Sequence, residues 1–404
     1  MRKVTYITRS FPVHSQTFVV NQIVSTINKG YDVGVLTYKL KNFDKSSQPS
    51  NLSNNGIKDV TEIIDYKIPK NRFFRYIKGL ILYFKYFKYN RLSAYASKKE
   101  HWFFQPYLVN FFIKYSDADI FHIHFANAGL DIAAMKKLGV VKAELILTLH
   151  GFSVHYKNEL EKERLVTTYQ NLFQQVKYIT VNSQYLLNKI INLQCDEVKL
   201  RIIPMGVDTD FFTSTNKKSI IDKPVKLLSV GRLIELKGHK YGIKSVKYLV
   251  DNGLLVHYTI IGVGREEKNL KQLVKDLSLE SYVTFLGLKN QQELKEQYDK
   301  HHIFLMTSIT DNQNRAEAQG LVTLEAQSMG LPVVAFNSGG VKSTLTSSTG
   351  FLVQEKSIRD FCDAITKLYN DDKLYSKMSI NAQKFVHNNF SLRELTKSVV
   401  ALYE

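Results

Sequence analysis

The sequence predicts an α/β protein of two doubly wound domains, and three observations lead to that prediction. The chain has 404 residues, which is too long for one ordinary core and fits two domains of about 200 residues each. Short apolar strands alternate with helical stretches in both halves, an order that builds parallel sheets. A polar segment, residues 213–224, separates the two alternating runs. We therefore expect domains at 1–212 and 225–390, with a linker between them and a last helix, 391–404, that packs back on the first domain.

The first half opens with a strand, a helix and a second strand at residues 4–8, 18–30 and 32–38, and Gly30 ends the helix. The later strands of this half are expected at 120–125, 144–150, 178–183 and 201–212. The second half repeats the alternation, with strands expected at 225–231, 256–262, 282–287, 303–308 and 332–337, and helices at 238–252 and 268–279. A helix–turn–helix is expected at 360–390 and a final helix at 392–404. Ligands of open parallel sheets bind beyond the carboxyl ends of the strands. We expect those ends to face a cleft between the domains.

Composition restricts the class of protein. A hydrophobic content of 44% with 23% charged residues is ordinary for a globular chain. The two cysteines, Cys195 and Cys362, lie too far apart in sequence for a disulfide framework or a metal cluster. We therefore expect the protein to work in a reducing cytoplasm. Neither a signal-peptide core nor an uncharged apolar run of bilayer length is present.

The net charge of +18 is unevenly distributed. Residues 67–114 hold 11 Lys and Arg against one acid, Glu100, together with 15 aromatic residues. Within 71–92 the cations recur at spacings that favour one helical face. Two interpretations are open: a helix that lies on an anionic membrane surface, or a domain helix whose apolar face is in the core and whose cations are in water. No nucleic-acid module is recognisable, so no nucleic-acid partner is expected.

Two glutamates, Glu317 and Glu325, flank Gly320 and the start of an apolar helix. Glycine permits close approach of a ligand to the backbone, and a helix N-terminus suits a diphosphate. Both carboxylates can accept hydrogen bonds from sugar or ribose hydroxyls. The alternative is an ordinary loop with two solvated acids.

Arg232 and Lys237 follow the strand at 225–231. Together they could offset the charges of a departing nucleoside diphosphate, although either could also be a surface cation. Gly262 and Gly264 lack the third glycine of a dinucleotide fingerprint, so NAD is not expected.

Two Asp-x-Asp pairs, Asp117/Asp119 and Asp208/Asp210, offer too few oxygens for a hard cation. His122 and His124 alternate on a strand, which is more typical of structural histidines than of ligands. No metal and no other cofactor is expected.

In combination these segments resemble the retaining glycosyltransferases of family 4, which have the GT-B fold of two Rossmann-like domains, and in particular exopolysaccharide and lipopolysaccharide sugar transferases. The resemblance covers nearly the whole chain. It is carried by RSFPVHSQTF (9–18), LTLHG (147–151), IPMGVD (203–208), VGRLIELKG (230–238), the Glu317/Glu325 segment and LPVVAFNSGG (331–340).

The resemblance implies a role for each matching residue. On the donor side, Arg232 and Lys237 bind the diphosphate, Glu325 binds the ribose and Glu317 binds the transferred sugar. The backbone of Gly320, Leu321 and Val322 faces phosphate, and the loop after Gly287 borders the nucleobase. In the first domain His150 is near the reaction centre, and Gln16 and Thr17 face the acceptor or the donor phosphate.

The resemblance further implies transfer of a hexose, with retention of configuration and without metal, from a nucleotide-sugar such as a UDP-hexose. The acceptor is a polysaccharide or a lipid-linked oligosaccharide, met at the inner face of a membrane. Gln16, Ser153 and Met205 stand where relatives often have Glu, Asp and Asn, which leaves the sugar and the acceptor open. Lys342-Ser343 stands where Pro-Glu is frequent. A nucleotide-sugar epimerase or phosphorylase of the same architecture and a non-catalytic basic membrane-associated protein remain as alternatives.

Overall fold

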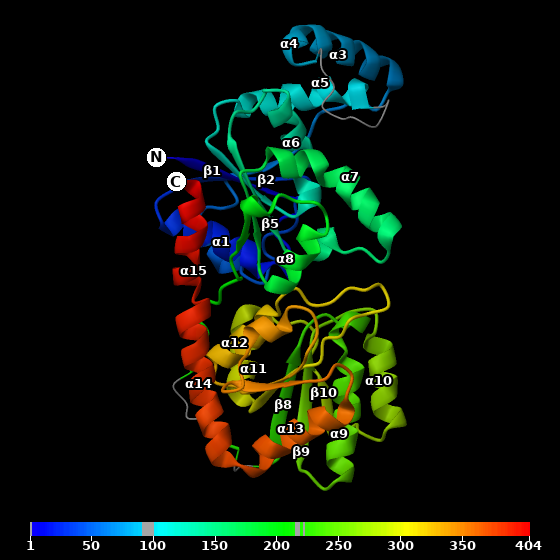
Figure 1. Ribbon diagram of the computed structural model, residues 1–404, viewed down its shortest axis with the longest axis vertical. Coiled ribbons are helices and arrows are strands. Elements are labelled where there is room, and N and C mark those ends of the chain that lie inside the picture. Colours follow the sequence, from blue (N-terminus) through cyan, green and yellow to red (C-terminus); the bar gives the residue numbers. More distant parts are fainter. Residues whose placement is uncertain (1, 91–100, 215–218, 221–222) are drawn as a thin grey trace. The chain divides into compact units, whose positions relative to one another are not determined.

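The computed structural model describes residues 2–90, 101–214, 219–220 and 223–404, with the side chains of 101–103 left aside, and confirms two parallel-sheet α/β units (Figure 1). The first unit comprises the chain to Val181, Leu187–Ile202 and Ser398–Glu404, and the second comprises Asn182–Leu186 and Ile203–Lys397. Residues 203–212, which the sequence analysis assigned to the first domain, thus belong to the second unit. Parts of the expected linker (215–218, 221–222) and of the basic segment (91–92) lie outside the described residues.

The first unit is built on a seven-stranded parallel sheet in the order β3-β2-β1-β4-β5-β6-β7. Its strands are β1 (Lys3–Thr8), β2 (Asp32–Thr37), β3 (Thr61–Ile63), β4 (Ile120–His124), β5 (Glu144–Leu149), β6 (Tyr178–Val181) and β7 (Leu200–Ile202). Every residue of β4 is buried, as expected for a central parallel strand covered on both faces. The helices of this half are α1 (Thr17–Asn28), α2 (Pro49–Asn54), α3 (Arg72–Lys85), α4 (Phe87–Asn90), α5 (His101–Phe112), α6 (Leu130–Lys137), α7 (Glu159–Gln175) and α8 (Gln184–Ile191).

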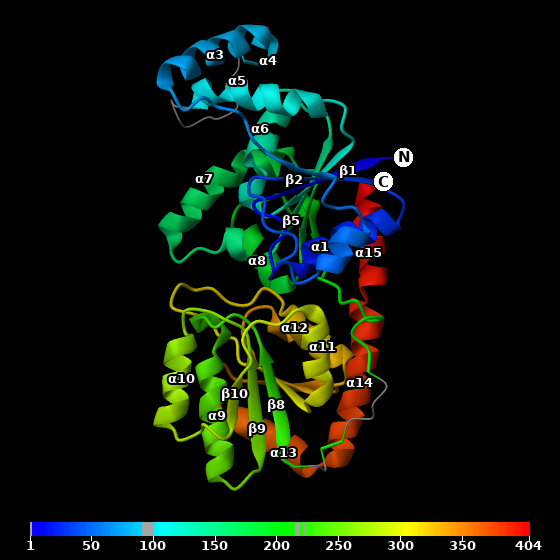
Figure 2. The ribbon, with the colours of Figure 1, turned by 180° about the vertical axis from the view of Figure 1, so that it is seen from behind.

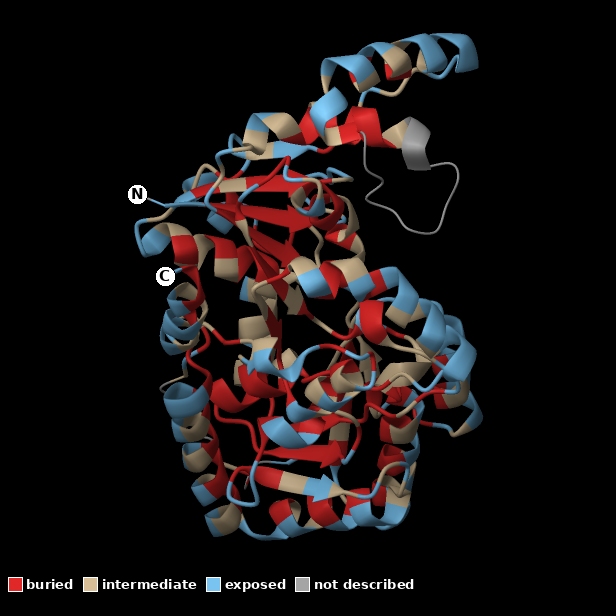
Figure 3. Cartoon of the chain, turned by 45° about the horizontal axis from the view of Figure 1, so that its top comes forward, coloured by how far each residue is buried: buried red, intermediate tan, exposed pale blue. Residues whose placement is uncertain are grey.

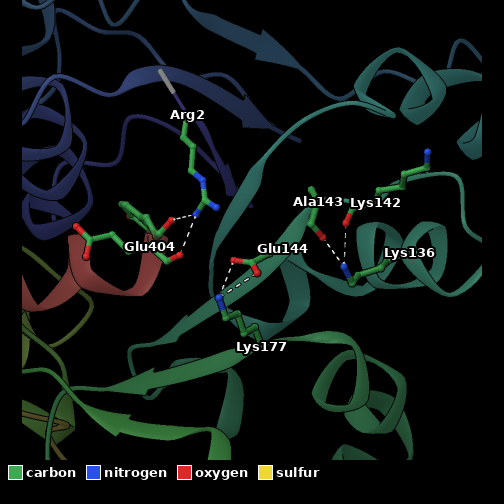
Figure 4. Close-up of polar contacts among 8 residues, drawn as sticks. Arg2, Lys136, Lys142, Ala143, Glu144, Lys177 and Glu404 are labelled. Atoms are coloured by element: carbon green, nitrogen blue, oxygen red, sulfur yellow. Dashed lines mark hydrogen bonds and ion pairs between the residues drawn. The ribbon is translucent and has the colours of Figure 1, made fainter.

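Polar contacts join distant parts of the first unit (Figure 4). Arg2 donates to the backbone carbonyl oxygens of Tyr403 and Glu404, the latter at 3.3 Å. Lys177 reaches both carboxylate oxygens of Glu144 at 2.9 Å, which joins β5 to the residue before β6. The side chain of Tyr403 is fully buried, with its hydroxyl 3.0 Å from that of Tyr6. The last residues of the chain are therefore part of the core of the first unit.

The second unit is built on a six-stranded parallel sheet in the order β10-β9-β8-β11-β12-β13 (Figure 2). Its strands are β8 (Val225–Val230), β9 (Val256–Ile261), β10 (Val283–Phe285), β11 (Ile303–Met306), β12 (Val333–Phe336) and β13 (Gly350–Val353). Successive residues belong to opposite cores: Leu227 packs in one apolar cluster and Leu228 in the other. The helices are α9 (His239–Asp251), α10 (Glu267–Asp276), α11 (Gln291–Lys300), α12 (Leu321–Ser328), α13 (Ile358–Asn370), α14 (Asp372–Phe390) and α15 (Leu392–Val400).

Two edge strands were not predicted, and one expected strand was too long. The edge strands β3 and β13 were not predicted, because each has only three or four residues and is partly exposed. The strand expected at 201–212 ends at Ile202, since Pro204 cannot donate to a sheet ladder. Beyond it, Val207 instead pairs with Ser391 in an isolated bridge.

Much of the surface of helix α3 is exposed (Figure 3), and of its apolar side chains Leu82 is buried while several large ones are not. Phe73, Phe74 and Phe84 are 67%, 61% and 70% exposed. On the opposite side Arg75 donates to the carbonyl of Pro69 at 2.9 Å, and Tyr107 of α5 donates to the carbonyl of Arg75. These contacts hold Arg75 in place on the side of the helix that also contains the buried Leu82. Within the part of the chain that the structure describes, no helix is both long and apolar enough to cross a bilayer.

Candidate active site

The carboxyl edge of the second sheet carries all the residues expected to bind a donor. Arg232 and Lys237 follow β8, Gly287 follows β10, and the segment 317–325 follows β11. Because the strands are parallel, their following loops emerge at one edge of the sheet. The structure thus gathers at one edge groups that are up to about ninety residues apart in sequence.

Lys237 and Glu317 form an ion pair at this edge, with Nζ 2.5 Å from Oε2. Their side chains are only 14% and 19% exposed. The backbone of Lys237 is fixed as well, because the hydroxyl of Thr307, which follows β11, donates to its carbonyl at 2.9 Å. A β-carbon at Gly231 would lie 3.3 Å from the Lys237 side chain, so the lysine stem lies close over the end of β8.

Helix α12 begins at this edge because Gly320 turns the chain. Gly320 has φ 94° and ψ 62°, a left-handed conformation that other residues rarely adopt. An added β-carbon there would lie 2.9 Å from the methyl carbon of Met306. The next two residues, Leu321 and Val322, are partly exposed and occupy the first turn, where amide groups have no partner within a helix. This turn can present backbone donors and the positive end of the helix dipole to an anion.

Glu325 lies one turn into α12 and is 6% exposed. The hydroxyl of Tyr298 donates to its Oε2 at 2.9 Å. Burial raises the pKa of Glu325 to about 7, despite the opposing effect of the Tyr298 hydrogen bond. Its carboxyl is therefore oriented by Tyr298 and changes charge near neutral pH.

Gly262 packs closely against the loop that carries Arg232, a role that the sequence analysis did not assign to it. It has φ 143°, and a β-carbon there would lie 1.9 Å from the carbonyl oxygen of Gly231. Its amide donates to the carbonyl of Gly287 at 2.8 Å. The glycine thus lets three loops approach one another at the edge, while the side chain of Arg232 remains exposed.

In the first unit His150 follows β5 and is stacked on other rings. Its ring centroid is 4.2 Å from that of Phe18, which follows Gln16 and Thr17 at the start of α1. His150 Nε2 lies 2.8 Å from His124 Nδ1, and the two rings are parallel within 4°. Burial, reinforced by His124 and His122, holds the pKa of His150 well below its usual range, so the imidazole is neutral at pH 7.

Other candidate residues have structural partners. His122 is buried between the hydroxyls of Tyr403 and Thr148, each 2.6 Å away. Asp119 accepts from the backbone amide of Lys3 at 2.8 Å, and Asp208 accepts from that of Phe211 at 3.0 Å. Each of these three residues, which sequence spacing had raised as a possible metal ligand, thus has a hydrogen-bond partner within its own unit.

Two residues that orient the site were not singled out in the sequence. Thr307 contacts Lys237, and Tyr298 contacts Glu325. The only hint was the position of Thr307, which directly follows β11. His124, which was noted in the sequence as a structural histidine, contacts His150.

Comparison with known proteins adds to this geometry. Residues 16–211 match the family model described as Glycosyltransferase Family 4, and residues 210–385 match the model described as Glycosyl transferases group 1. The amylovoran biosynthesis glycosyltransferase AmsK of Erwinia amylovora is 28% identical over 397 residues, 96% of each chain. The Escherichia coli UDP-Gal:alpha-D-GlcNAc-diphosphoundecaprenol alpha-1,3-galactosyltransferase is 26% identical over 306 residues, 72% of this chain and 76% of that protein.

Among solved structures, Anabaena Alr3699/HepE in complex with UDP-glucose superimposes with a TM-score of 0.75 at 16% identity, over 100% of this chain and 99% of that one. This likeness shows the GT-B fold. With both halves of the chain matched by the two models, the protein belongs to the family 4, group 1 glycosyltransferases.

Proposed function

We propose that this glycosyltransferase moves a hexose from a UDP-hexose to a polysaccharide or lipid-linked oligosaccharide, with retention of configuration and without a metal ion. The observation that carries the proposal is the Lys237–Glu317 ion pair beside the start of α12 at one sheet edge. The names of two similar proteins support the choice of donor: one is a UDP-Gal-dependent transferase, and the other is described in complex with UDP-glucose.

In this proposal the groups of the second unit bind the donor. Arg232, Lys237 and the first-turn amides of α12 offset the charge of the departing diphosphate, so that no divalent cation is needed. Glu317 accepts hydrogen bonds from hydroxyls of the transferred sugar, and Glu325 from the ribose. The loop after Gly287 borders the base.

In the same proposal the first unit binds the acceptor through Gln16 and Thr17, and its His150 takes part in the transfer. A hydroxyl oxygen of the acceptor bonds to the anomeric carbon on the face that the diphosphate leaves, as the bond from that carbon to the phosphate oxygen breaks. The proton of the hydroxyl passes to the departing diphosphate oxygen. Attack on the same face retains the configuration. The neutral His150 can exchange hydrogen bonds with hydroxyl groups without adding charge.

The test is release of nucleoside diphosphate from UDP-, GDP- and ADP-sugars by the wild type, Arg232→Ala and Glu317→Ala, with and without EDTA. We expect release from one UDP-hexose, lost in both variants, unaffected by EDTA and faster with acceptor. Loss of activity in EDTA that only a divalent cation restores would contradict the metal-independent step. Conversion of the donor to its epimer without transfer would favour the epimerase alternative. The anomeric configuration of the product, read by NMR, tests retention.

We further propose that helix α3 contacts the anionic membrane that holds a lipid-linked acceptor. Its exposed side chains Phe73, Ile77, Ile81 and Phe84 recur at helical spacing, and they form an apolar stripe that nothing in the described chain covers. Exposed cations flank this stripe, among them Arg72, Lys85 and Lys88. Aromatic and cationic side chains on one exposed helix suit the headgroup region of an anionic bilayer.

Flotation of the protein with phosphatidylglycerol and phosphatidylcholine vesicles tests the membrane contact. We expect flotation with the anionic vesicles and its loss in Ile81→Ser and in Lys85→Gln/Lys88→Gln. Leu255→Ser is the matched control, since Leu255 is 58% exposed and Ile81 61%, but Leu255 belongs to the second unit. Equal failure of the wild type with both vesicles, or equal losses in Ile81→Ser and Leu255→Ser, would refute the contact.

A further inference from the structure

Gln319 lies in the segment 307–320 between β11 and α12, which we call the donor loop. None of the roles proposed above involves its side chain. It is fully buried. Its Oε1 accepts from the backbone amide of Met205 at 2.8 Å, and its Nε2 donates to the carbonyl of Met205 at 3.1 Å. Both polar atoms of one amide side chain thus bind the backbone of one distant residue, which fixes the position of that side chain in two directions.

Met205 belongs to the segment 203–207, through which the chain enters the second unit; we call it the crossover segment. This segment is itself held in place. Val207 donates to the carbonyl of Phe390 and accepts from the amide of Leu392, both at 2.8 Å. A β-carbon at Gly206 would lie 2.7 Å from the α-carbon of Leu392, so the two stretches are in close contact. Backbone hydrogen bonds therefore fix the crossover segment, which in turn holds the donor loop through the two hydrogen bonds of Gln319.

The donor loop depends on such supports because it contains little regular structure between β11 and α12. Besides Gln319, the amide of Gly340 donates to the carbonyl of Glu317 at 2.7 Å. Gln319 directly precedes Gly320, the N-cap residue of α12, and lies two residues after Glu317. A shift at Gln319 would move both the carboxylate and the helix start.

We infer that Gln319 is a positioning residue, which fixes the donor loop on the crossover segment and thereby sets the affinity for the nucleoside diphosphate. This inference rests on the proposed function of the same site. Loss of two hydrogen bonds, with displacement of the helix start, is expected to weaken UDP binding and to raise the donor KM about 10- to 100-fold. The value of kcat should change less, because the side chain does not contact the reacting atoms.

A matched control is available in Gln327 on α12. It is also fully buried, and its Nε2 donates to the carbonyls of Thr323 and Thr344 at 3.2 and 2.6 Å. Gln327→Leu removes a comparable buried amide without touching the crossover segment, so it reports the purely structural cost. Gln319→Glu retains an acceptor for the Met205 amide but loses the donor, and should be intermediate. Met205→Ala leaves the backbone partners in place and should bind UDP like the wild type.

The experiment measures the Kd for UDP by calorimetry, the donor kinetics and Tm for the wild type and these variants. We expect Gln319→Leu to bind UDP at least ten times more weakly than Gln327→Leu at similar Tm, with Gln319→Glu between Gln319→Leu and the wild type. If Gln319→Leu does not fold, a weakened Kd in Gln319→Glu at wild-type Tm still supports the inference. Wild-type Kd in either Gln319 variant, or equal losses in Gln319→Leu and Gln327→Leu, would overturn it while leaving the proposed function intact. A wild type that binds none of UDP, GDP and ADP would refute both.

Discussion

The ammonium group of Lys237 lies 2.5 Å from a carboxylate oxygen of Glu317, across 80 positions of sequence. Because both side chains are largely buried, each is the principal counter-ion of the other. A donor diphosphate would compete with Glu317 for the lysine and free the carboxylate for sugar hydroxyls. The ion pair therefore holds the two groups at the site before the donor arrives.

Removing either partner should impair both activity and stability. We expect Lys237→Met and Glu317→Gln each to lower kcat/KM by about 100-fold or more, since in the proposed function each removes a charge that acts on the donor. Each should also lower the free energy of unfolding by about 1–3 kcal/mol, because a poorly solvated charge loses its partner. In the double variant the stability loss should be smaller than the sum. Steady-state kinetics and urea denaturation check this.

Lys271→Ala is the control for that series. Lys271 pairs with Glu267 at 2.7 Å on the exposed face of α10, where an ion pair contributes at most about 1 kcal/mol. A loss of activity in Lys271→Ala equal to that in Lys237→Met would show that the effect is not specific to the site.

Ionisation of Glu325 should lower the free energy of unfolding as the pH rises. Its pKa is about 7 in the folded protein against 4.5 for an ordinary glutamate carboxyl, so folding favours the protonated form. The stabilisation is complete below pH 4.5 and is lost as pH rises through about 7. From pH 5 to 7.5 this amounts to about 2–3 kcal/mol. Urea denaturation at both pH values should show this loss in the wild type relative to Glu325→Gln, which cannot ionise; parallel behaviour would contradict the assignment.

The opposite dependence is expected for His124. Burial lowers its pKa from 6.5 to about 3, so folding favours the neutral ring. The stabilisation is present above pH 6.5 and is lost as pH falls towards 3, with about 2 kcal/mol lost by pH 5. On going from pH 7.5 to 5, the wild type should therefore lose about 2 kcal/mol more than His124→Leu. An equal loss in both proteins would show that His124 does not titrate as the burial predicts.

Gly262→Ala should weaken donor binding through the backbone. The added methyl would meet the carbonyl oxygen of Gly231 at 1.9 Å and displace the loop that carries Arg232. We expect at least a tenfold rise in the Kd for UDP, measured by calorimetry. Gly253→Ala is the control, because Gly253 also has a positive φ, of 76°, but no atom within 4 Å of the added carbon. Equal affinities for UDP in Gly262→Ala and Gly253→Ala would contradict the displacement of the Arg232 loop.

The two alternating runs of strands and helices could be predicted from the sequence because apolar periodicity and turn residues act over short distances. The same local signals placed Arg232, Glu317 and Gly320 in loops after strands, and the structure confirms that placement. The edge strands β3 and β13 escaped prediction because partly exposed runs of three or four residues carry little periodic signal.

By itself, then, the sequence determined the two parallel-sheet halves, the family resemblance and the residue types at the candidate site. Only the tertiary structure decided which groups meet: Lys237 with Glu317, His124 with His150, and Gln319 with Met205. It also decided that Phe73 and Phe84 of α3 are exposed whereas Leu82 of the same helix is buried. Such partners lie tens of residues apart in the chain, and their pairing follows from strand order and burial, which no local pattern encodes.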